Sequence, residues 1–135
     1  MISARTSLRI SVLILLALAL SAFAAPASDF SGTYTLGAAA AAGKDVQLTI
    51  MLTVANNTSS SISNAIISLH EPQAGRIVYG QLAGLSLAPG GSTHISGSFR
   101  VPQALYDSWQ KGSSPAMSVA YNDAKGNPVQ SFIQF

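Results

Sequence analysis

Two histidines and one neighbouring acid are the residues of this 135-residue chain whose types could hold a metal ion. His70 is followed directly by Glu71, and His94 lies further along the chain. Imidazole nitrogens and a carboxylate are ligands that zinc accepts. However, His94 falls on the outward side of an alternating stretch, and His70 ends a stretch that we expect in the opposite sheet. The sequence therefore predicts solvated surface histidines, no metal site and no cofactor.

A nucleophile is the second kind of chemistry that the sequence could carry. Serine is abundant, but no serine stands in the G-x-S-x-G pattern that exposes a nucleophile on a sharp turn. A serine triad would need a histidine beside an acid, and no spacing places such residues together. The five Asp and Glu residues are scattered near expected turns, so paired carboxylates for glycoside hydrolysis are not indicated. We therefore expect a protein that is not an enzyme.

The stretch YNDAKGNPV, residues 121–129, gathers turn-forming and oxygen-bearing residues between two apolar runs. Asp123, Gly126 and Asn127 could offer oxygens to calcium, which prefers several carboxylate and carbonyl ligands. Only one carboxylate is available, and the cation Lys125 lies beside it. Asn, Asp and Gly are also the residues that a tight turn needs for backbone reasons alone. We interpret the stretch as a hairpin turn.

One segment, PQALYDSWQKG at residues 102–112, has helical spacing and combines two large aromatics with charges of both signs. Proline at its start suits the first turn of a short helix. Exposed aromatics on a connection often mark a surface for a partner. The alternative is that Leu105 and Trp109 plug one end of the fold, since a lone tryptophan is more often buried. The candidate binding residues of this segment are Tyr106, Asp107, Trp109 and Lys111.

These residues must be positioned by β-strands, because period-two alternation dominates the chain from residue 30 onward. The clearest case is residues 46–54, where five apolar residues alternate with Gln, Thr and Met. This pattern predicts a strand with one buried face, formed by Val46, Leu48, Ile50, Leu52 and Val54. Further short strands are expected at residues 30–37, 62–70, 76–82, 85–87, 92–101, 116–121 and 129–135.

About seven short strands with turn signals between them indicate an antiparallel β-sandwich or a small closed barrel. An α/β fold is disfavoured because no long helical pattern separates the strands. The expected strand at residues 30–37 is followed by an alanine-rich, low-complexity run at residues 38–43.

Three turn motifs occur at strand ends: V-x-N-x-[ST], L-x-P-G and Y-x-D-x-x-G. Their residues are Val54, Asn56 or Asn57, and Thr58; Leu87, Pro89 and Gly90; and Tyr121, Asp123 and Gly126. With these motifs, residues 46–135 resemble bacterial extracytoplasmic immunoglobulin-like modules, and in particular the cell-adhesion-related domain found in bacteria. The resemblance implies an immunoglobulin-like antiparallel sandwich of about seven strands. The motifs consist of turn residues, so they indicate a fold more than an activity.

The first 24 residues have the pattern of a secretory signal peptide. Arg5 and Arg9 form a short basic head, an apolar run follows, and Ala22 and Ala24 suit a cleavage site after residue 24. An uncleaved anchor is the alternative, but the run is shorter than the roughly 20 residues that cross a bilayer. We expect a signal-peptide helix at residues 1–24, one domain at residues 25–135, and an exported protein in the periplasm or outside the cell.

The charge of the exported chain excludes one class of partner. Two of the seven Lys and Arg residues lie in the expected signal peptide. The exported chain therefore keeps five Lys and Arg residues and five Asp and Glu residues, which gives a net charge of zero. No basic stripe is present to bind phosphate backbones, so no nucleic acid is expected. The chain has no cysteine, so the exported domain must rely on its own core rather than on disulfides.

Three functions remain open after the sequence analysis. The first is a non-catalytic binding or structural module that acts on another protein or an envelope polymer. The second is a subunit of a surface assembly joined through strand edges, which would need an unprotected edge strand. The third is a secreted metal-handling protein or enzyme of sandwich fold, which would need any two of His70, Glu71, His94 and Asp107 to converge.

Overall fold

The computed structural model describes residues 28–72 and 76–135. The expected signal peptide and its cleavage site lie outside these residues. The described chain forms seven strands and one short helix, which confirms the all-β class. The elements are β1 (Phe30–Ala42), β2 (Asp45–Asn56), β3 (Ile62–His70), β4 (Val78–Leu87), β5 (Ser92–Pro102), α2 (Gln103–Gln110), β6 (Ala116–Asn122) and β7 (Pro128–Gln134). Within the described ranges, no helix is long and apolar enough to cross a membrane.

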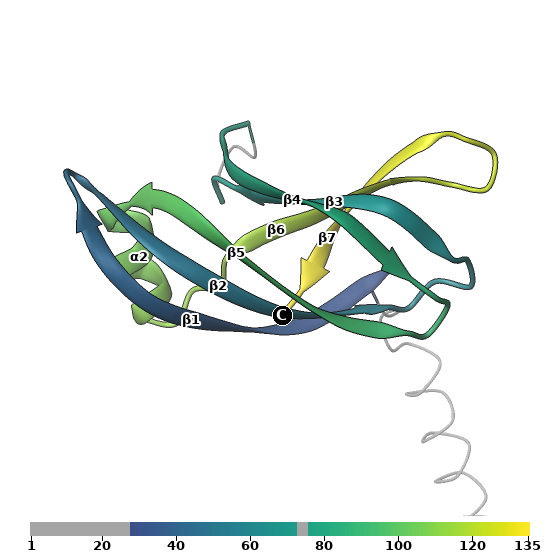
Figure 1. Ribbon diagram of the computed structural model, residues 1–135, viewed down its shortest axis with the longest axis horizontal. Helices are drawn as coiled ribbons and strands as arrows, with labels where there is room; N and C mark the ends of the chain where they lie inside the picture. Colours follow the sequence, from purple (N-terminus) through teal and green to yellow (C-terminus); the bar gives the residue numbers. More distant parts are fainter. Residues whose placement is uncertain (1–27, 73–75) are drawn as a thin grey trace, which may run out of the picture.

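The strands form one mixed sheet in the order β4-β3-β6-β7-β1-β2-β5. Neighbouring strands are antiparallel except β1 and β7, which pair in parallel at Phe30–Ile133 and Ser31–Gln134. The expectation of a purely antiparallel arrangement is therefore wrong at this junction. The parallel pairing is short because β1 continues along β2, whereas β7 continues along β6. Figure 1 shows the β1-β2-β5 half and the β4-β3-β6-β7 half facing each other as two layers.

The core lies between the two halves and takes alternate residues from the strands. The five apolar residues predicted for the buried face of β2 are all buried, and Gln47 and Thr49 between them are exposed. Ala65, Ile67 and Leu69 on β3 are likewise fully buried. The period of two holds because successive side chains of a strand point to opposite faces, and the opposite half covers only one of them.

The fourth strand differs from its prediction, because residues 76–82 and 85–87 were expected as two separate pieces. The structure has one continuous strand, β4, with a bulge where Ala65 pairs with Leu85 and Ile67 with Leu82. Gly84 lies in this bulge with φ of +82°, a left-handed conformation that glycine adopts without strain. The glycine therefore bends the strand and does not end it.

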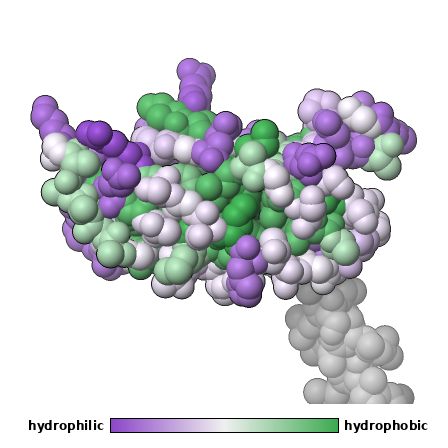
Figure 2. All heavy atoms as spheres, viewed as in Figure 1, coloured by the Kyte–Doolittle hydropathy of each residue, from purple (hydrophilic) through white to green (hydrophobic). Residues whose placement is uncertain are grey.

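The two edge strands of the sheet, β4 and β5, approach each other across the opening between the layers. Gly80 on β4 lies against the ring of Phe99, so closely that a Cβ atom on it would lie 2.6 Å from Phe99 Cδ1. Gly97 on β5 lies against the side chain of Leu82 in the same way. This seam is not fully sealed, since Leu82 and Ile95 remain half-buried, and Figure 2 shows apolar residues along the middle of this face.

Asn56 joins two of the three turn motifs. Its side chain is fully buried; Nδ2 donates to the carbonyl oxygens of Ser60 (2.9 Å) and Ala88 (3.2 Å), and Oδ1 accepts from the Thr58 amide at 3.0 Å. The Gly90 amide donates to the Asn56 carbonyl at 2.8 Å. The asparagine thus fastens the loop after β2 to the turn before β5, as expected for residues that act through turn chemistry.

The first strand is longer than expected. The expected strand ended at residue 37, before the low-complexity run, but β1 continues through residues 38–42 to a two-residue turn at Gly43 and Lys44. The alanines are held in the strand by pairing with β2, from Ala39 opposite Leu48 to Ala42 opposite Asp45. A bulge between Leu36 and Ala39 precedes this run. Pairing with β2 therefore overrides the weak strand preference of alanine.

Candidate functional site

The helix α2 follows β5 directly and lies at one end of the two layers (Figure 1). Trp109 is 5% exposed and belongs to the core, and Leu105 and Tyr106 pack against it as half-buried residues. The alternative in which Leu105 and Trp109 plug this end is thus supported. Trp109 is the one buried residue of the helix, and its large ring packs into the core at this end.

The other candidate residues of this segment lie at the surface. Asp107 is exposed, and its Oδ1 accepts a hydrogen bond from Gln103 Nε2 at 2.9 Å, one helical turn earlier. Lys111 is exposed, and its backbone amide ends the helix by donating to the carbonyl oxygens of Asp107 and Ser108. Neither charge is paired with an opposite charge in the described part of the chain, where the one ion pair joins Arg100 to Asp45.

A groove of about 460 Å³ runs beside α2, between the helix and the start of β4. It combines two aromatic rings, one carboxylate and three serines. Its lining residues are Glu71, Pro72, Tyr79, Pro102, Ala104, Leu105, Ser108, Trp109, Ser113 and Ser114. Apolar walls with a few polar groups are the usual composition of a ligand site. Of the four sequence-predicted binding residues, Trp109 alone lines this groove, and Tyr106, Asp107 and Lys111 lie on other parts of the segment.

Tyr79 gives the groove a hydroxyl that stays protonated. Burial raises the pKa of its phenol above the usual value of 10.0, and the nearby carboxylates of Glu71 and Asp45 raise it further. Both causes disfavour the phenolate. Tyr79 therefore remains a neutral donor and acceptor through the physiological range, beside the carboxylate of Glu71.

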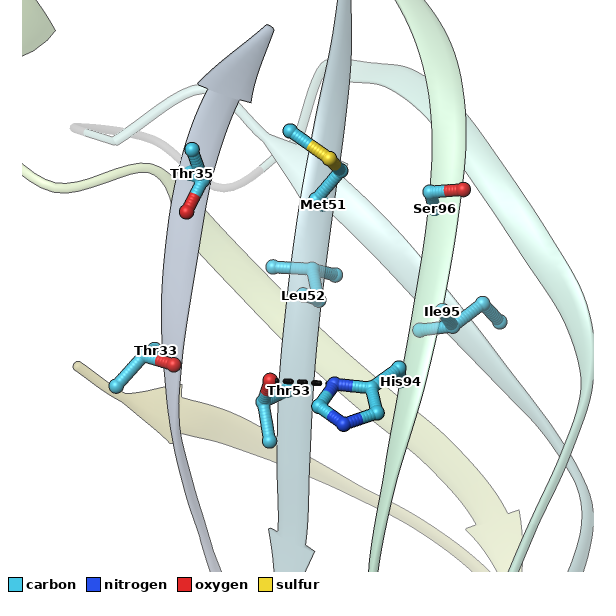
Figure 3. Close-up of a pocket in the computed structure, with 8 residues that line it drawn as sticks. All are labelled: Thr33, Thr35, Met51, Leu52, Thr53, His94, Ile95 and Ser96. Atoms are coloured by element: carbon cyan, nitrogen blue, oxygen red, sulfur yellow. Dashed lines mark hydrogen bonds between the residues drawn. The ribbon is translucent and has the colours of Figure 1, made fainter.

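A second hollow lies on the outer face of the β1-β2-β5 half (Figure 3). Its volume is about 410 Å³, and it is lined by Thr33, Thr35, Met51, Leu52, Thr53, His94, Ile95 and Ser96. Thr53 Oγ1 and His94 Nδ1 lie 2.8 Å apart on neighbouring strands. Thr53 also stands opposite Thr33 on β1. The hollow is thus a hydroxyl-rich strand surface without a carboxylate.

A polar cluster that the sequence analysis missed lies on the outer face of the β4-β3-β6-β7 half. His70 Nε2 and Ser118 Oγ lie 2.6 Å apart, and Gln130 Nε2 donates to the same Ser118 oxygen at 3.0 Å. The expectation of a solvated His70 is wrong, because the residue is 5% exposed and its ring packs against Phe132, with ring centres 5.3 Å apart. Ser118 is fully buried, so a substrate cannot reach its hydroxyl in this conformation.

The remaining candidates do not come together as a metal site. His70 lies on β3 and His94 on β5, two strands that do not pair. In residues 28–72 and 76–135, no group of three His, Asp or Glu side chains gathers closely enough to hold a metal ion. Asp123 acts as a turn residue, since its Oδ1 accepts from the amides of Lys125 and Asn127, both at 2.9 Å. The hairpin turn predicted between β6 and β7 is therefore confirmed.

Comparison with known proteins gives matches among solved structures, and none among family models or curated proteins. No family model matches it. No curated protein matches it either. Similar solved structures include a structural genomics target named SoR45, 9% identical with a TM-score of 0.42 over 78% of this chain and 80% of that one.

Two further structures are similar at the same level. An ApaA protein from Bordetella pertussis is 12% identical with a TM-score of 0.41, over 82% of this chain and 92% of that one. A protein from Archaeoglobus fulgidus is 11% identical with a TM-score of 0.36, over 78% of this chain and 95% of that one. At these scores the similarities carry no argument about fold or function.

Proposed function

We propose that this protein is an exported, non-catalytic module of immunoglobulin-like fold that binds another protein or an envelope polymer. The signal-peptide pattern of residues 1–24 supports export to the periplasm or beyond. The two facing halves, with α2 inserted between β5 and β6, support an immunoglobulin-like sandwich. The buried Asn56, which ties two turn motifs together, supports the resemblance to bacterial adhesion-related domains.

The groove beside α2 is the observation that carries the binding role. It is lined by the half-buried ring of Tyr79, the carboxylate of Glu71, three serine hydroxyls and the small exposed part of Trp109. Aromatic walls with hydrogen-bonding groups suit a sugar ring or an aromatic-bearing peptide, because both present apolar faces and polar edges. In this proposal, Trp109 forms a wall of the site.

The surface residues of the same segment extend the contact area beyond the groove. Tyr106 is half-buried, and Asp107 and Lys111 are exposed with charges of opposite sign. Such a rim of an aromatic and two charges resembles the composition of partner surfaces, in which a packed centre is surrounded by polar contacts. We assign these three residues to the rim of the binding surface.

The non-catalytic assignment is supported by the two imidazole–hydroxyl pairs. Ser118 beside His70 is buried, and Gln130, its other partner, carries no charge. The Thr53–His94 pair lies on a strand surface whose hollow is lined by no acid. A nucleophile needs both access and an oriented base, and each pair lacks one of these in the described residues.

Co-sedimentation with envelope fractions tests the proposal. The fractions are purified peptidoglycan and envelope membranes with their proteins, each mixed with the exported protein. Ala104→Arg places a long side chain in the groove from an exposed position, whereas Gln110→Arg adds the same charge on the same helix outside the lining. Wild type and Gln110→Arg should bind, and Ala104→Arg should lose most of the binding.

The Tyr106→Ala variant tests the rim separately. We expect partial loss of binding from a folded protein, because Tyr106 is half-buried and its removal leaves Trp109 in place. Binding of Ala104→Arg at wild-type strength would contradict the groove as the site. A wild-type protein that binds neither fraction would contradict the binding function itself.

A second candidate function is a subunit of a surface assembly joined through strand edges. The side of β1 that faces away from β2 favours this function, because β7 pairs with that side at two positions only. In the part of the chain that the structure describes, no cluster of side chains favours the metal-handling or catalytic alternative.

A further inference from the structure

The strand β1 is paired on both sides only at its beginning. β7 contacts it at Phe30 and Ser31, and then ends near Tyr34, whose ring lies edge-on to Phe135 at 5.0 Å. Beyond that point β1 pairs with β2 alone, over residues 32–42. No other described strand pairs with this segment, which we call the open edge. Its outward backbone amides and carbonyls form a template for another strand.

The open edge lacks most of the features that protect edge strands. Residues 32–42 contain no charged residue and no proline, the residue types that usually prevent pairing with another chain. The one protective device is the bulge between Leu36 and Ala39. It leaves the run from Ala39 to Ala42 in regular pairing with β2.

The backbone groups available on this run follow from the hairpin. Gly43 and Lys44 form a two-residue turn, so the residues that flank it, Ala42 and Asp45, form a hydrogen-bonded pair. Along an antiparallel ladder, hydrogen-bonded pairs alternate with pairs that exchange no hydrogen bonds. The amides and carbonyls of Ala40 and Ala42 therefore point toward β2. Those of Ala39 and Ala41 point away from it, into the open edge.

The side chains of the run leave room for a second strand on both faces. Ala39 and Ala41 stand opposite Leu48 and Val46, which are buried, yet both alanines are exposed. Ala40, on the other face, is exposed as well. Methyl groups do not obstruct the close approach of a neighbouring strand. This run is therefore the least hindered part of the open edge.

We propose that the open edge binds the open edge of a second copy of this chain, antiparallel and centred on Ala40. In this arrangement Ala39 of each copy exchanges backbone hydrogen bonds with Ala41 of the other, and the two Ala40 residues face each other. The two β1-β2-β5 halves then form one continuous six-stranded sheet. The inference deepens the second candidate function and is independent of the groove beside α2.

Charge and symmetry favour a second copy as the occupant. Antiparallel self-pairing brings no like charges together, because the strand has none and the two Lys44 side chains lie at opposite ends of the pairing. The exported chain also has no net charge that would keep copies apart. A two-fold contact uses each open edge once, so the assembly closes as a dimer.

Sedimentation equilibrium of the exported protein, up to about 1 mM because a single strand contact is weak, tests the proposal. Two lysine variants on the same rung are compared, Ala40→Lys on β1 and Gln47→Lys on β2, both at exposed positions. Ala40→Lys places two ammonium groups opposite each other and should raise the dimer dissociation constant about tenfold or more. Gln47→Lys lies one strand inside the edge and should change it by less than about twofold.

Cysteine substitution gives a second, positional readout, because the natural chain contains no cysteine. Facing residues of a pair without hydrogen bonds have Cα atoms about 4.5 Å apart, within the range that a disulfide spans. Ala40→Cys should therefore form a linked dimer on mild oxidation, and Gln47→Cys should remain monomeric. A monomeric wild type at every concentration overturns the proposal. A dimer unaffected by Ala40→Lys, or equal linking of the two cysteine variants, overturns it too.

Discussion

The outer faces of the two halves carry the two histidines in different environments. On the β4-β3-β6-β7 half, His70 is buried beneath neighbouring side chains and bonded within a polar cluster. On the β1-β2-β5 half, His94 is exposed, and its Nδ1 lies 2.8 Å from Thr53 Oγ1. Both residues point away from the core. Alternation along a strand therefore predicts the face to which a side chain points. Whether a side chain on an outer face is buried depends on the side chains of the other strands that lie beside it.

The neighbours explain the contrast. Phe132 stands opposite Ser118, and its ring covers His70, while Gln130 reaches the same serine from β7. The threonines around His94 are too short to cover an imidazole ring. A long or aromatic side chain on the same face, here two strands away across β6, thus converts an outward polar position into a buried one.

The largest expected loss of stability comes from a residue on the inner face, and the effects of changing the outer faces are measured against it. Ile50→Ala should lower the free energy of unfolding by about 2–5 kcal/mol, because the side chain is fully buried between the halves. Its neighbour Thr49 is exposed, and Thr49→Ala should change stability by no more than about 0.5 kcal/mol. Denaturant titration measures both. A loss below about 1 kcal/mol for Ile50→Ala would contradict its place in the core.

The two histidines provide the direct test of the contrast between the outer faces. His70→Ala should cost about 1–3 kcal/mol, because it removes a buried ring and leaves Ser118 with one partner fewer. His94→Ala should stay within about 0.5 kcal/mol of wild type. Equal losses in the same titration would show that the outer faces do not differ as described. A double-mutant cycle of His70→Ala with Ser118→Ala sharpens the result by isolating the coupling within the cluster.

The smallest expected effect is a loss of stability at alkaline pH. It arises from two tyrosines that both belong to the β4-β3-β6-β7 half. Burial raises the pKa of Tyr79, aided by Glu71 and Asp45, and burial raises that of Tyr121, aided by Asp29 and Asp123. At pH values below the usual tyrosine pKa of 10.0, the contribution of both protonated tyrosines to stability is fully present. Above it the unfolded chain loses these protons first, so stability should fall as pH rises through the folded-state pKa values.

Ultraviolet absorbance of tyrosinate checks this prediction. The folded protein should ionise part of its tyrosine at higher pH than the protein in denaturant. Tyr79→Phe and Tyr121→Phe should each remove one late-titrating group and reduce the alkaline loss of stability. Titration curves that coincide for folded and unfolded protein would argue against raised pKa values at both sites.

The inner faces could be predicted from the sequence because each depends on a local pattern. Val46 to Val54 alternate with Gln, Thr and Met, and Phe99 lies between Ser98 and Arg100. Burying the wrong set would expose the whole apolar face. The hairpin turn at Asp123 was predictable for the same reason, since its bonds span only a few residues. The short helix with Trp109 at its buried face also follows from local spacing.

The features that could not be predicted depend on pairing between distant segments. The bond between His70 and Ser118 requires the register of β3 on β6, which no local pattern encodes. The alanine run became a strand because β2 is long enough to pair with it. The groove beside α2 likewise brings together residues from Glu71 to Ser114. Within the candidate site, the segment at residues 102–112 could be predicted from the sequence. The opposite wall of the groove, formed by Tyr79 on β4, could not.

Trp109 is the single tryptophan of the chain, and its burial beneath α2 makes it a natural optical probe of one end of the molecule. Indole emission shifts toward the red when the ring meets water, so fluorescence reports the undocking of α2. Far-ultraviolet circular dichroism is dominated by the strands and reports the sheet instead. If the two signals are lost together on heating, the helix and the sheet form one cooperative unit. Earlier loss of the fluorescence signal would show that the end carrying the groove opens before the rest, and that a bound partner could close it.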